Sequence, residues 1–291
     1  METIRRDLER VVVGRRIGQV TVTGARSVRR HGTAAAAGTA ATAGGCGSDG
    51  DQAGLPAGLR GRLVVAVGRR GKYLLARLDD RAVLVVHLGM SGQLAWSTGP
   101  VDPLPKHTHV TIAFEPEGEL RFVDPRTFGE IFLTATGDPE GQVPELAHLG
   151  SDPVADTMSW TDFAARLHAR RTRLKALLMD QRFLAGIGNI YSDEILFGAG
   201  LRFDRVPGTL TSQDVRRLYR SMRETLSEAI RLRGSSLADQ QYRDLFGQIG
   251  GYQAEHQVYA RQGQPCRRCR ASIIRVRSGG RSSYYCPGCQ V

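Results

Sequence analysis

Four of the five cysteines form two C-x2-C pairs near the end of the chain, in the pattern C-x2-C-x16-C-x2-C. They are Cys266, Cys269, Cys286 and Cys289. Four thiolates at this spacing are typical of a closed tetrahedral zinc site, which leaves no position for a catalytic water. Two disulfides are disfavoured, because the charged N-terminal residues do not resemble a secretion signal. We predict one structural Zn²⁺ bound by these four cysteines. The fifth cysteine, Cys46, lies alone in a low-complexity segment.

The zinc pattern encloses two short strand-like runs, SIIRVR and RSSYY, joined by SGG. These runs predict a β-hairpin with Arg281 close to its tip. A module this small has almost no hydrophobic core, so its shape depends on the metal. The sequence therefore predicts a rigid, basic fingertip.

A second candidate site is the stretch AGIGN, in which Gly186 and Gly188 precede Asn189. The glycines allow the backbone to approach a bulky group closely. Asn189 and the N–H groups of a following helix can then bind a phosphate. A plain glycine turn between two helices is the alternative, and these residues alone leave both interpretations open.

Strand-like segments dominate the first part of the chain. LVVAV, KYLLARL and AVLVVHL are β-branched or alternating runs, and HVTIAF and ELRFV flank the loop EPEG. Ahead of them, apolar residues from Ile4 to Val12 recur at helical spacing. We predict a β-sandwich with a leading helix over residues 1–135. Residues 31–60 are expected to form a flexible low-complexity insertion, because they offer few large apolar side chains to bury.

From residue 150 the hydrophobic period becomes helical. SWTDFAARLHARRTRLKALLMD and TSQDVRRLYRSMRETLSEAIRLRG carry apolar residues at intervals of three and four, and Thr211 with Asp214 has the capping-box pattern. We predict a helical domain over 150–235 and a separate zinc module over 258–291. The fold class is α+β with several domains.

The chain of 291 residues has a net charge of +11 and a pI near 9.9. Arginine is spread along the whole sequence, which suits a polyanionic partner, although arginine-rich coding gives the same composition. No run approaches the roughly 18–20 apolar residues of a membrane span. We expect a cytoplasmic protein with no membrane partner.

Taken together, these motifs resemble the bacterial formamidopyrimidine-DNA glycosylase family over nearly the whole chain. The resemblance rests on GRRGKYLL, HLGMSG, KHTHV, DPRTFG, LLMDQRFLAGIGNIYSDEILFGAG and the four-cysteine segment, in that order. It implies an N-terminal β-sandwich, a central helix-two-turn-helix domain and a C-terminal β-hairpin zinc finger. Residues 236–257 occupy the place of a lesion-recognition loop and linker.

The resemblance also implies a bifunctional DNA glycosylase and abasic-site lyase of base excision repair. Members remove oxidised purines, such as 8-oxoguanine and formamidopyrimidines, from double-stranded DNA. An amine attacks C1′ of the sugar and expels the base, and the resulting Schiff base permits β- and then δ-elimination. The target nucleotide must first leave the helix. The expected partner is duplex DNA with such a lesion or an abasic site, and the expected state is a monomer.

Five residues match roles close to the lesion. Lys72 matches a lysine that acts during elimination, and Arg281 matches a fingertip arginine that contacts the flanking phosphates and assists δ-elimination. Met90, Arg126 and Phe128 match side chains that fill the void left by the flipped base, where Arg126 addresses the orphaned base. Taken singly, Met90 and Phe128 fit an ordinary core position better than this role.

Three residues match family positions that hold the DNA backbone: His107, Arg171 and Asn189. Lys175, in LKALLMD, is a further candidate for a phosphate contact. His109 is instead expected to pack within a strand.

Three departures from the family pattern leave the lesion preference open. Thr108 stands where the family commonly has Asp, and Thr127 stands where a second Arg is common. SSLADQQYRDLFGQIGGYQ, from Ser235, differs from the better-known forms of the lesion-recognition loop.

The largest departure lies at the start of the sequence. Family members begin with a proline, in a segment close to PELPEVETIRRDL. The proline amine is the nucleophile, and the neighbouring glutamate is its acid–base partner. This chain matches from ETIRRDL and has Met1 in place of the valine. A valine encoded by GTG can be read as a start codon, so we expect a misplaced start and a sequence without the catalytic proline and glutamate.

Two other functional interpretations remain. A protein that truly starts at Met1 would bind damaged or kinked DNA without excising bases. An endonuclease VIII-like enzyme for oxidised pyrimidines is less favoured, because HLGMSG and DPRTFG resemble the purine branch more closely. In-frame codons for MPELPE upstream of Met1 would support the enzyme, and an in-frame stop would support the binding protein.

Overall fold

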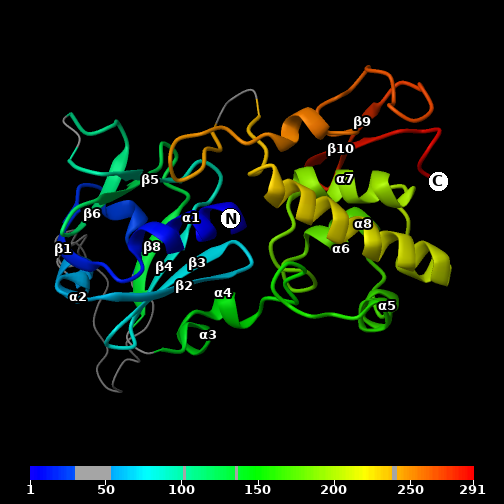
Figure 1. Ribbon diagram of the computed structural model, residues 1–291. Coiled ribbons are helices and arrows are strands. Elements are labelled where there is room, and N and C mark those ends of the chain that lie inside the picture. Colours follow the sequence, from blue (N-terminus) through cyan, green and yellow to red (C-terminus); the bar gives the residue numbers. More distant parts are fainter. Residues whose placement is uncertain (30–53, 101–102, 135–136, 238–240) are drawn as a thin grey trace, which may run out of the picture. The chain divides into compact units, whose positions relative to one another are not determined.

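Two compact units make up the chain (Figure 1). Unit 1 contains Met1–Ala147 and Ser236–Gly250, and unit 2 contains His148–Ser235 and Gly251–Val291. The segment predicted as one linker, 236–257, is therefore divided between the units. The computed structural model describes residues 1–29, 54–100, 103–134, 137–237 and 241–291.

Unit 1 begins with helix α1, Glu2–Val12, which has the predicted amphipathic character. Ile4 and Leu8 are almost fully buried and join the core of the unit. Glu2 lies on the polar side and forms an ion pair with Arg69 at 3.1 Å. Because Arg69 belongs to strand β2, this pair ties the start of the helix to a sheet.

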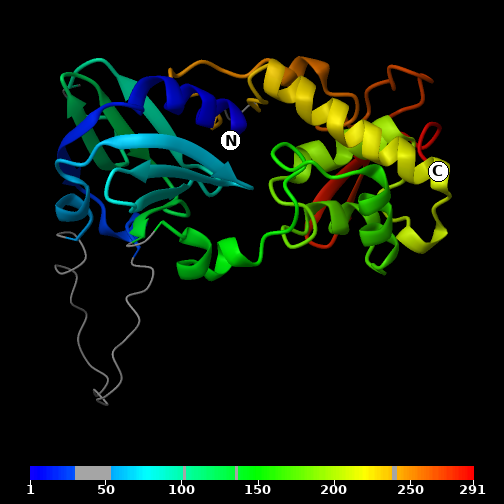
Figure 2. The ribbon, with the colours of Figure 1, turned by 60° about the horizontal axis from the view of Figure 1, so that its bottom comes forward.

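Two four-stranded antiparallel sheets form the body of unit 1 (Figures 1 and 2). The first has the strand order β1-β6-β7-β5 and the second the order β2-β3-β4-β8. Apolar residues of both sheets share one core with α1, so the predicted sandwich with a leading helix is confirmed. The strands are β1 (Arg16–Val22), β2 (Val64–Arg70), β3 (Tyr73–Leu78), β4 (Val83–His87), β5 (Gln93–Ser97), β6 (Thr108–Glu115), β7 (Glu119–Val123) and β8 (Glu130–Thr134).

Part of the predicted flexible insertion is a helix. Residues Gly54–Leu59 form α2, because Leu55 and Leu59 are buried in the sandwich core. This apolar pair supplies the burial that the Ala- and Gly-rich sequence ahead of it lacks. Residues 31–53, which include Cys46, lie outside the described residues.

Unit 1 also extends beyond the predicted boundary at residue 135. Two short helices, α3 (Pro139–Gln142) and α4 (Pro144–Ala147), follow β8 and are included in the same compact unit. Elsewhere in unit 1, a short 3₁₀ helix, η1 (Ala25–Ser27), follows β1.

Unit 2 is helical, as predicted, and its longest helix is α8, Ser212–Arg231. The predicted capping box of Thr211 and Asp214 is present at its start. A Cβ added to Gly198 of α7 would lie 2.2 Å from the Ser221 hydroxyl, so glycine permits the close packing of α7 on α8. The remaining helices are α5 (Trp160–His168), α6 (Leu174–Met179), α7 (Asn189–Ala199), η2 (Pro207–Thr209) and η3 (Tyr252–Glu255).

The predicted C-terminal hairpin consists of β9, Ile274–Ser278, and β10, Arg281–Tyr285. Its turn is formed by Gly279 and Gly280, both at positive φ. The cysteine module packs on α7, where Phe197 shares a buried cluster with Val258, Cys266, Ile273 and Cys286. The module predicted as separate is therefore part of the compact helical unit. Within the described ranges, none of the helices has the length and apolarity needed to cross a bilayer.

Candidate functional site

Met90 and Phe128 lie on two adjoining turns of unit 1. Met90 follows β4, and Phe128 lies between β7 and β8; their exposed fractions are 64% and 58%. A Cβ on Gly89 would lie 2.7 Å from the backbone of Phe128, so the two turns meet and glycine is required there. Side chains this exposed are not core residues, and their position on two adjoining turns makes them a candidate interaction site.

Asp124 organises the turn that carries Arg126 and Phe128. Its side chain is fully buried, and Oδ1 accepts hydrogen bonds from Ser91 Oγ at 2.5 Å and from Arg126 N at 3.2 Å. Oδ2 accepts from Gly129 N at 2.7 Å. The sequence analysis missed this residue, although an Asp at the head of DPRTFG is a common acceptor for turn N–H groups.

The two histidines of KHTHV have different environments beside this turn. His107 is exposed, has a φ of +65°, and accepts a hydrogen bond from Asp124 N at its carbonyl O. His109 lies in β6, where Nε2 is 2.8 Å from the carbonyl O of Asp124. His109 therefore packs as predicted, whereas His107 is exposed and its backbone is bonded to Asp124, in the turn that carries Phe128.

Lys72 occupies the tight turn between β2 and β3. Burial lowers the pKa of His87, and the positive charges of Lys72 and Arg29 lower it further. Burial also lowers the pKa of the Met1 amino group to about 6, with contributions from Arg69 and Lys72. The positive charge of Lys72 therefore acts on both groups, and its catalytic role stays a prediction.

The AGIGN stretch is a fixed turn at the start of α7. Gln181 holds it, because Oε1 accepts from Gly186 N at 2.9 Å and Nε2 donates to Ile187 O at 2.9 Å. Asn189 is the first residue of the helix and donates from Nδ2 to the Tyr259 hydroxyl at 3.4 Å. Within the described residues its buried Oδ1 has no hydrogen-bond partner. Phosphate binding at this turn stays a prediction.

Lys175 differs from the predicted phosphate contact, because its ammonium group is buried and already paired. Nζ lies 2.8 Å from Asp193 Oδ1 and donates to Ser282 O at 2.6 Å. Asp193 Oδ2 accepts from Tyr284 N at 3.0 Å. Burial lowers the pKa of Lys175 and raises that of Asp193 to about 6. The pair therefore fastens β10, whose first residue is Arg281, to α6 and α7.

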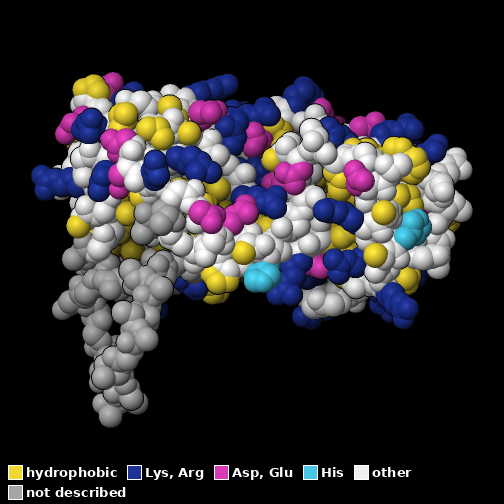
Figure 3. All heavy atoms as spheres, turned by 90° about the horizontal axis from the view of Figure 1, so that it is seen from below, with side chains coloured by type: hydrophobic (Ala, Val, Ile, Leu, Met, Phe, Trp, Pro, Cys, Tyr) yellow, Lys and Arg dark blue, Asp and Glu magenta, His cyan; other side chains and the backbone are white. Residues whose placement is uncertain are grey.

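Two predicted phosphate contacts of unit 2 are exposed. Arg281 follows the Gly279–Gly280 turn at the hairpin tip, and Arg171 lies in the connection between α5 and α6. On the face that Figure 3 shows, basic side chains are distributed over the surface with acidic ones among them. The roles of the two arginines stay predictions.

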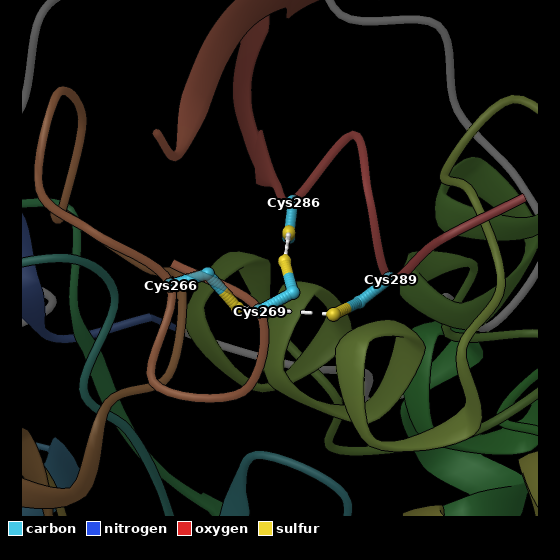
Figure 4. A group of neighbouring side chains, drawn as sticks. All are labelled: Cys266, Cys269, Cys286 and Cys289. Carbon is cyan, nitrogen blue, oxygen red and sulfur yellow. Dashed lines mark hydrogen bonds between the residues drawn. The ribbon is translucent and has the colours of Figure 1, made fainter. Parts of the chain in front are cut away.

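The four predicted zinc ligands converge in unit 2 (Figure 4). Their sulfur atoms all lie within 4.8 Å of one another; Cys266 and Cys289 are 3.8 Å apart, and Cys269 and Cys286 are 3.3 Å apart. Tetrahedral zinc with Zn–S bonds of about 2.3 Å separates its sulfurs by about 3.8 Å. The donor set and its spacing therefore fit one structural zinc ion.

Glu194 is a second structural residue that the sequence analysis missed. It is buried on α7, and its carboxylate accepts hydrogen bonds from the backbone N–H groups of Gln257, Val258 and Tyr259 at 2.8–3.0 Å. It thereby fixes the chain that leads into the cysteine module. The adjacent acids of YSDEIL, in a largely apolar helix, were the available signal.

Three family profiles match the chain in order. The formamidopyrimidine-DNA glycosylase N-terminal domain matches residues 1–131, and the formamidopyrimidine-DNA glycosylase H2TH domain matches residues 149–241. The zinc finger found in FPG and IleRS matches residues 263–291.

Relatives of similar length are known from sequence and structure. A formamidopyrimidine-DNA glycosylase of Nocardia farcinica is 40% identical, over 100% of this chain and 96% of its own length. The crystal structure of the MutM (Fpg) protein from Thermus thermophilus has a TM-score of 0.82 and 38% identity, covering 99% of this chain and 96% of that one. A complex of Lactococcus lactis Fpg with abasic-site DNA has a TM-score of 0.83 and 30% identity, covering 99% and 97%.

Proposed function

This chain belongs to the formamidopyrimidine-DNA glycosylase family, and on that premise we propose that it is a DNA glycosylase of base excision repair. Its substrates are oxidised purines in duplex DNA, and its lyase activity cleaves the strand at the abasic site. The relatives are bacterial, so the expected location is the cytoplasm, where the DNA lies. The expected active form is a monomer.

The observation that carries the proposal is the pair of adjoining turns with Met90 and Phe128. Both side chains are exposed, although each would gain free energy from leaving water. Gly89 and Asp124 hold the turns in place before any ligand binds. Preformed apolar wedges of this kind can replace the stacking that is lost when a nucleotide leaves the duplex.

The remaining roles follow the family resemblance, residue by residue. Lys72 acts at the sugar during elimination, and Arg281 binds the phosphates that flank the lesion through its planar guanidinium. His107, Arg171 and Asn189 contact the DNA backbone. One zinc ion gives the finger its shape and takes no part in the reaction.

Binding of two duplexes tests the wedge role. One duplex carries a tetrahydrofuran abasic-site analogue and the other is undamaged. We expect Phe128→Ala to weaken binding to the analogue by about 1–3 kcal/mol, the cost of one lost base–aromatic stack. Undamaged duplex, which keeps its stacking, should lose much less.

Leu104→Ala is the matched control, because Leu104 is also exposed, at 41%, but lies outside the two turns. It should leave both affinities near wild type. Equal losses on the two duplexes in Phe128→Ala would remove Phe128 from the void-filling role.

A further inference from the structure

An edge strand of the first sheet is covered by the second stretch of unit 1. Strand β5 lies at the end of the order β1-β6-β7-β5, and Trp96 N of β5 donates to Leu245 O at 2.8 Å. Gln93 Nε2 donates to Gln241 O at 2.6 Å. Leu245 is fully buried in the sandwich core. Residues 241–250 are thus docked on β5, beside which they run in Figure 1.

This docked stretch reaches Arg126. Arg126 Nη2 donates to Gln241 Oε1 at 2.9 Å, while the Arg126 backbone N is fixed by Asp124. Within the described part of the chain, Gln241 is the one side chain that bonds the Arg126 guanidinium. An arginine carries five N–H donors, so this contact leaves other donors for a ligand.

We propose that Gln241 is a positioning residue that sets opposite-base specificity, by holding the Arg126 guanidinium in the orientation that reads the orphaned base. The inference rests on the proposed function, since it takes Arg126 as the reader. A neutral amide suits this task, because it accepts the hydrogen bond without adding a negative charge that would repel the DNA phosphates. Holding a long side chain in advance also reduces the entropy lost on binding.

The chemistry of the guanidinium predicts which base is favoured. Arginine offers donors only, in a planar fork. On the pairing edge, cytosine presents two adjacent acceptors, N3 and O2. Adenine has one acceptor next to a donor, and guanine and thymine each place an N–H donor in the middle of the edge. A correctly oriented Arg126 should therefore prefer cytosine opposite the lesion.

The test is the ratio of two dissociation constants, measured with the full chain. The duplexes carry a tetrahydrofuran abasic-site analogue opposite adenine or opposite cytosine. Wild type should bind the cytosine duplex more tightly, and Arg126→Ala should abolish this preference. Gln241→Met, which keeps the length of the side chain but lacks the acceptor, should reduce the ratio at least threefold.

Three further variants separate positioning from folding. Gln241→Glu keeps an acceptor and should retain most of the ratio, because its added charge weakens both complexes alike. Gln241→Ala should reduce the ratio of dissociation constants as Gln241→Met does. It serves in place of Gln241→Met if that variant unfolds. Gln248→Met makes the same substitution at an exposed position of the docked stretch and should behave as wild type.

A wild-type ratio in Gln241→Met and Gln241→Ala overturns the inference, as does an equal weakening of both complexes at constant ratio. In those cases, loss of the cytosine preference in Arg126→Ala would still support Arg126 as the residue that reads the orphaned base. If Arg126→Ala itself keeps the ratio, Arg126 is not the reader, and the inference falls with that role. Failure of wild type to bind either duplex would contradict the proposed function.

Discussion

Ser91 donates a 2.5 Å hydrogen bond to Oδ1 of Asp124, and this bond joins the turn of Met90 to the turn of Phe128. Both residues are buried, at 3% and 0% exposure. The bond therefore connects the two surface turns through buried side chains. This bond forms when the protein folds, so the turns that carry Met90 and Phe128 are fixed in the absence of DNA.

Asp124→Asn should weaken this connection. Both carboxylate oxygens accept hydrogen bonds, whereas an asparagine would direct an NH₂ group at one of the present donors. We expect the free energy of unfolding to fall by about 1–3 kcal/mol in urea titrations. Asp138→Asn, at the exposed cap of α3, should cost less. Equal, small losses in the two variants would contradict the supporting role of Asp124.

The zinc content of the wild type and of cysteine variants tests the metal centre. Purified protein should contain one zinc per chain, and Cys286→Ser should lose both the zinc and the fold of the finger, because three thiolates cannot close the site. Cys46→Ser is the control and should keep a full equivalent. Less than half an equivalent in the wild type, or a folded finger in Cys286→Ser, would refute the closed-site assignment.

Salt dependence tests the fingertip. If Arg281 contacts a phosphate, Arg281→Ala should weaken binding to an abasic-site duplex. It should also reduce the slope of log K against log salt by about 1. Arg231, which is exposed on α8 and paired with Glu228, serves as the control, and Arg231→Ala should keep the wild-type slope. An unchanged slope in Arg281→Ala would exclude this phosphate contact.

Local patterns predicted much of this structure. The hairpin around EPEG, the capping box of Thr211 and Asp214, and the cysteine cluster each depend on residues close together in sequence. Their spacing alone determines the hydrogen bonds or ligands that they form. The motif resemblance then supplied the family, which the full-length relatives support.

Contacts between residues far apart in the sequence could not be predicted from local patterns. Leu245 is fully buried in a sandwich built from residues more than a hundred positions earlier, and no periodicity reports such a contact. Lys175 looked like a surface lysine because its partner, Asp193, lies on another helix. The helix at Leu55 and Leu59 forms because the sandwich offers those two side chains a core.

Buried His256 should make the stability of unit 2 depend on pH. Burial lowers the pKa of His256 from its ordinary 6.5 to about 4, and Ser235 Oγ lies 3.0 Å from Nε2. Between these two pH values the unfolded chain binds a proton that the folded chain does not. Stability is therefore complete above pH 6.5 and falls as the pH drops towards 4.

The expected loss from His256 between about pH 7.5 and about pH 5 is about 2 kcal/mol in the free energy of unfolding. His256→Gln cannot titrate, so its loss over the same interval should be smaller by that amount. His168→Gln, at an exposed position on α5, should follow the wild type. Parallel pH profiles for wild type and His256→Gln would contradict this account.

The most direct test of the proposed function is release of 8-oxoguanine from a duplex with cytosine opposite the lesion. A polypeptide that begins at Met1 is compared with one in which MPELPEV replaces Met1. We expect the extended polypeptide to release the base and to be trapped on the DNA by borohydride through its proline. The shorter one should bind with nearly undetectable release, because its amine is displaced by up to roughly 20 Å from the family position. Comparable release by both would contradict attack by the N-terminal proline amine and point to Lys72 as the nucleophile, and release by neither would contradict the proposed function.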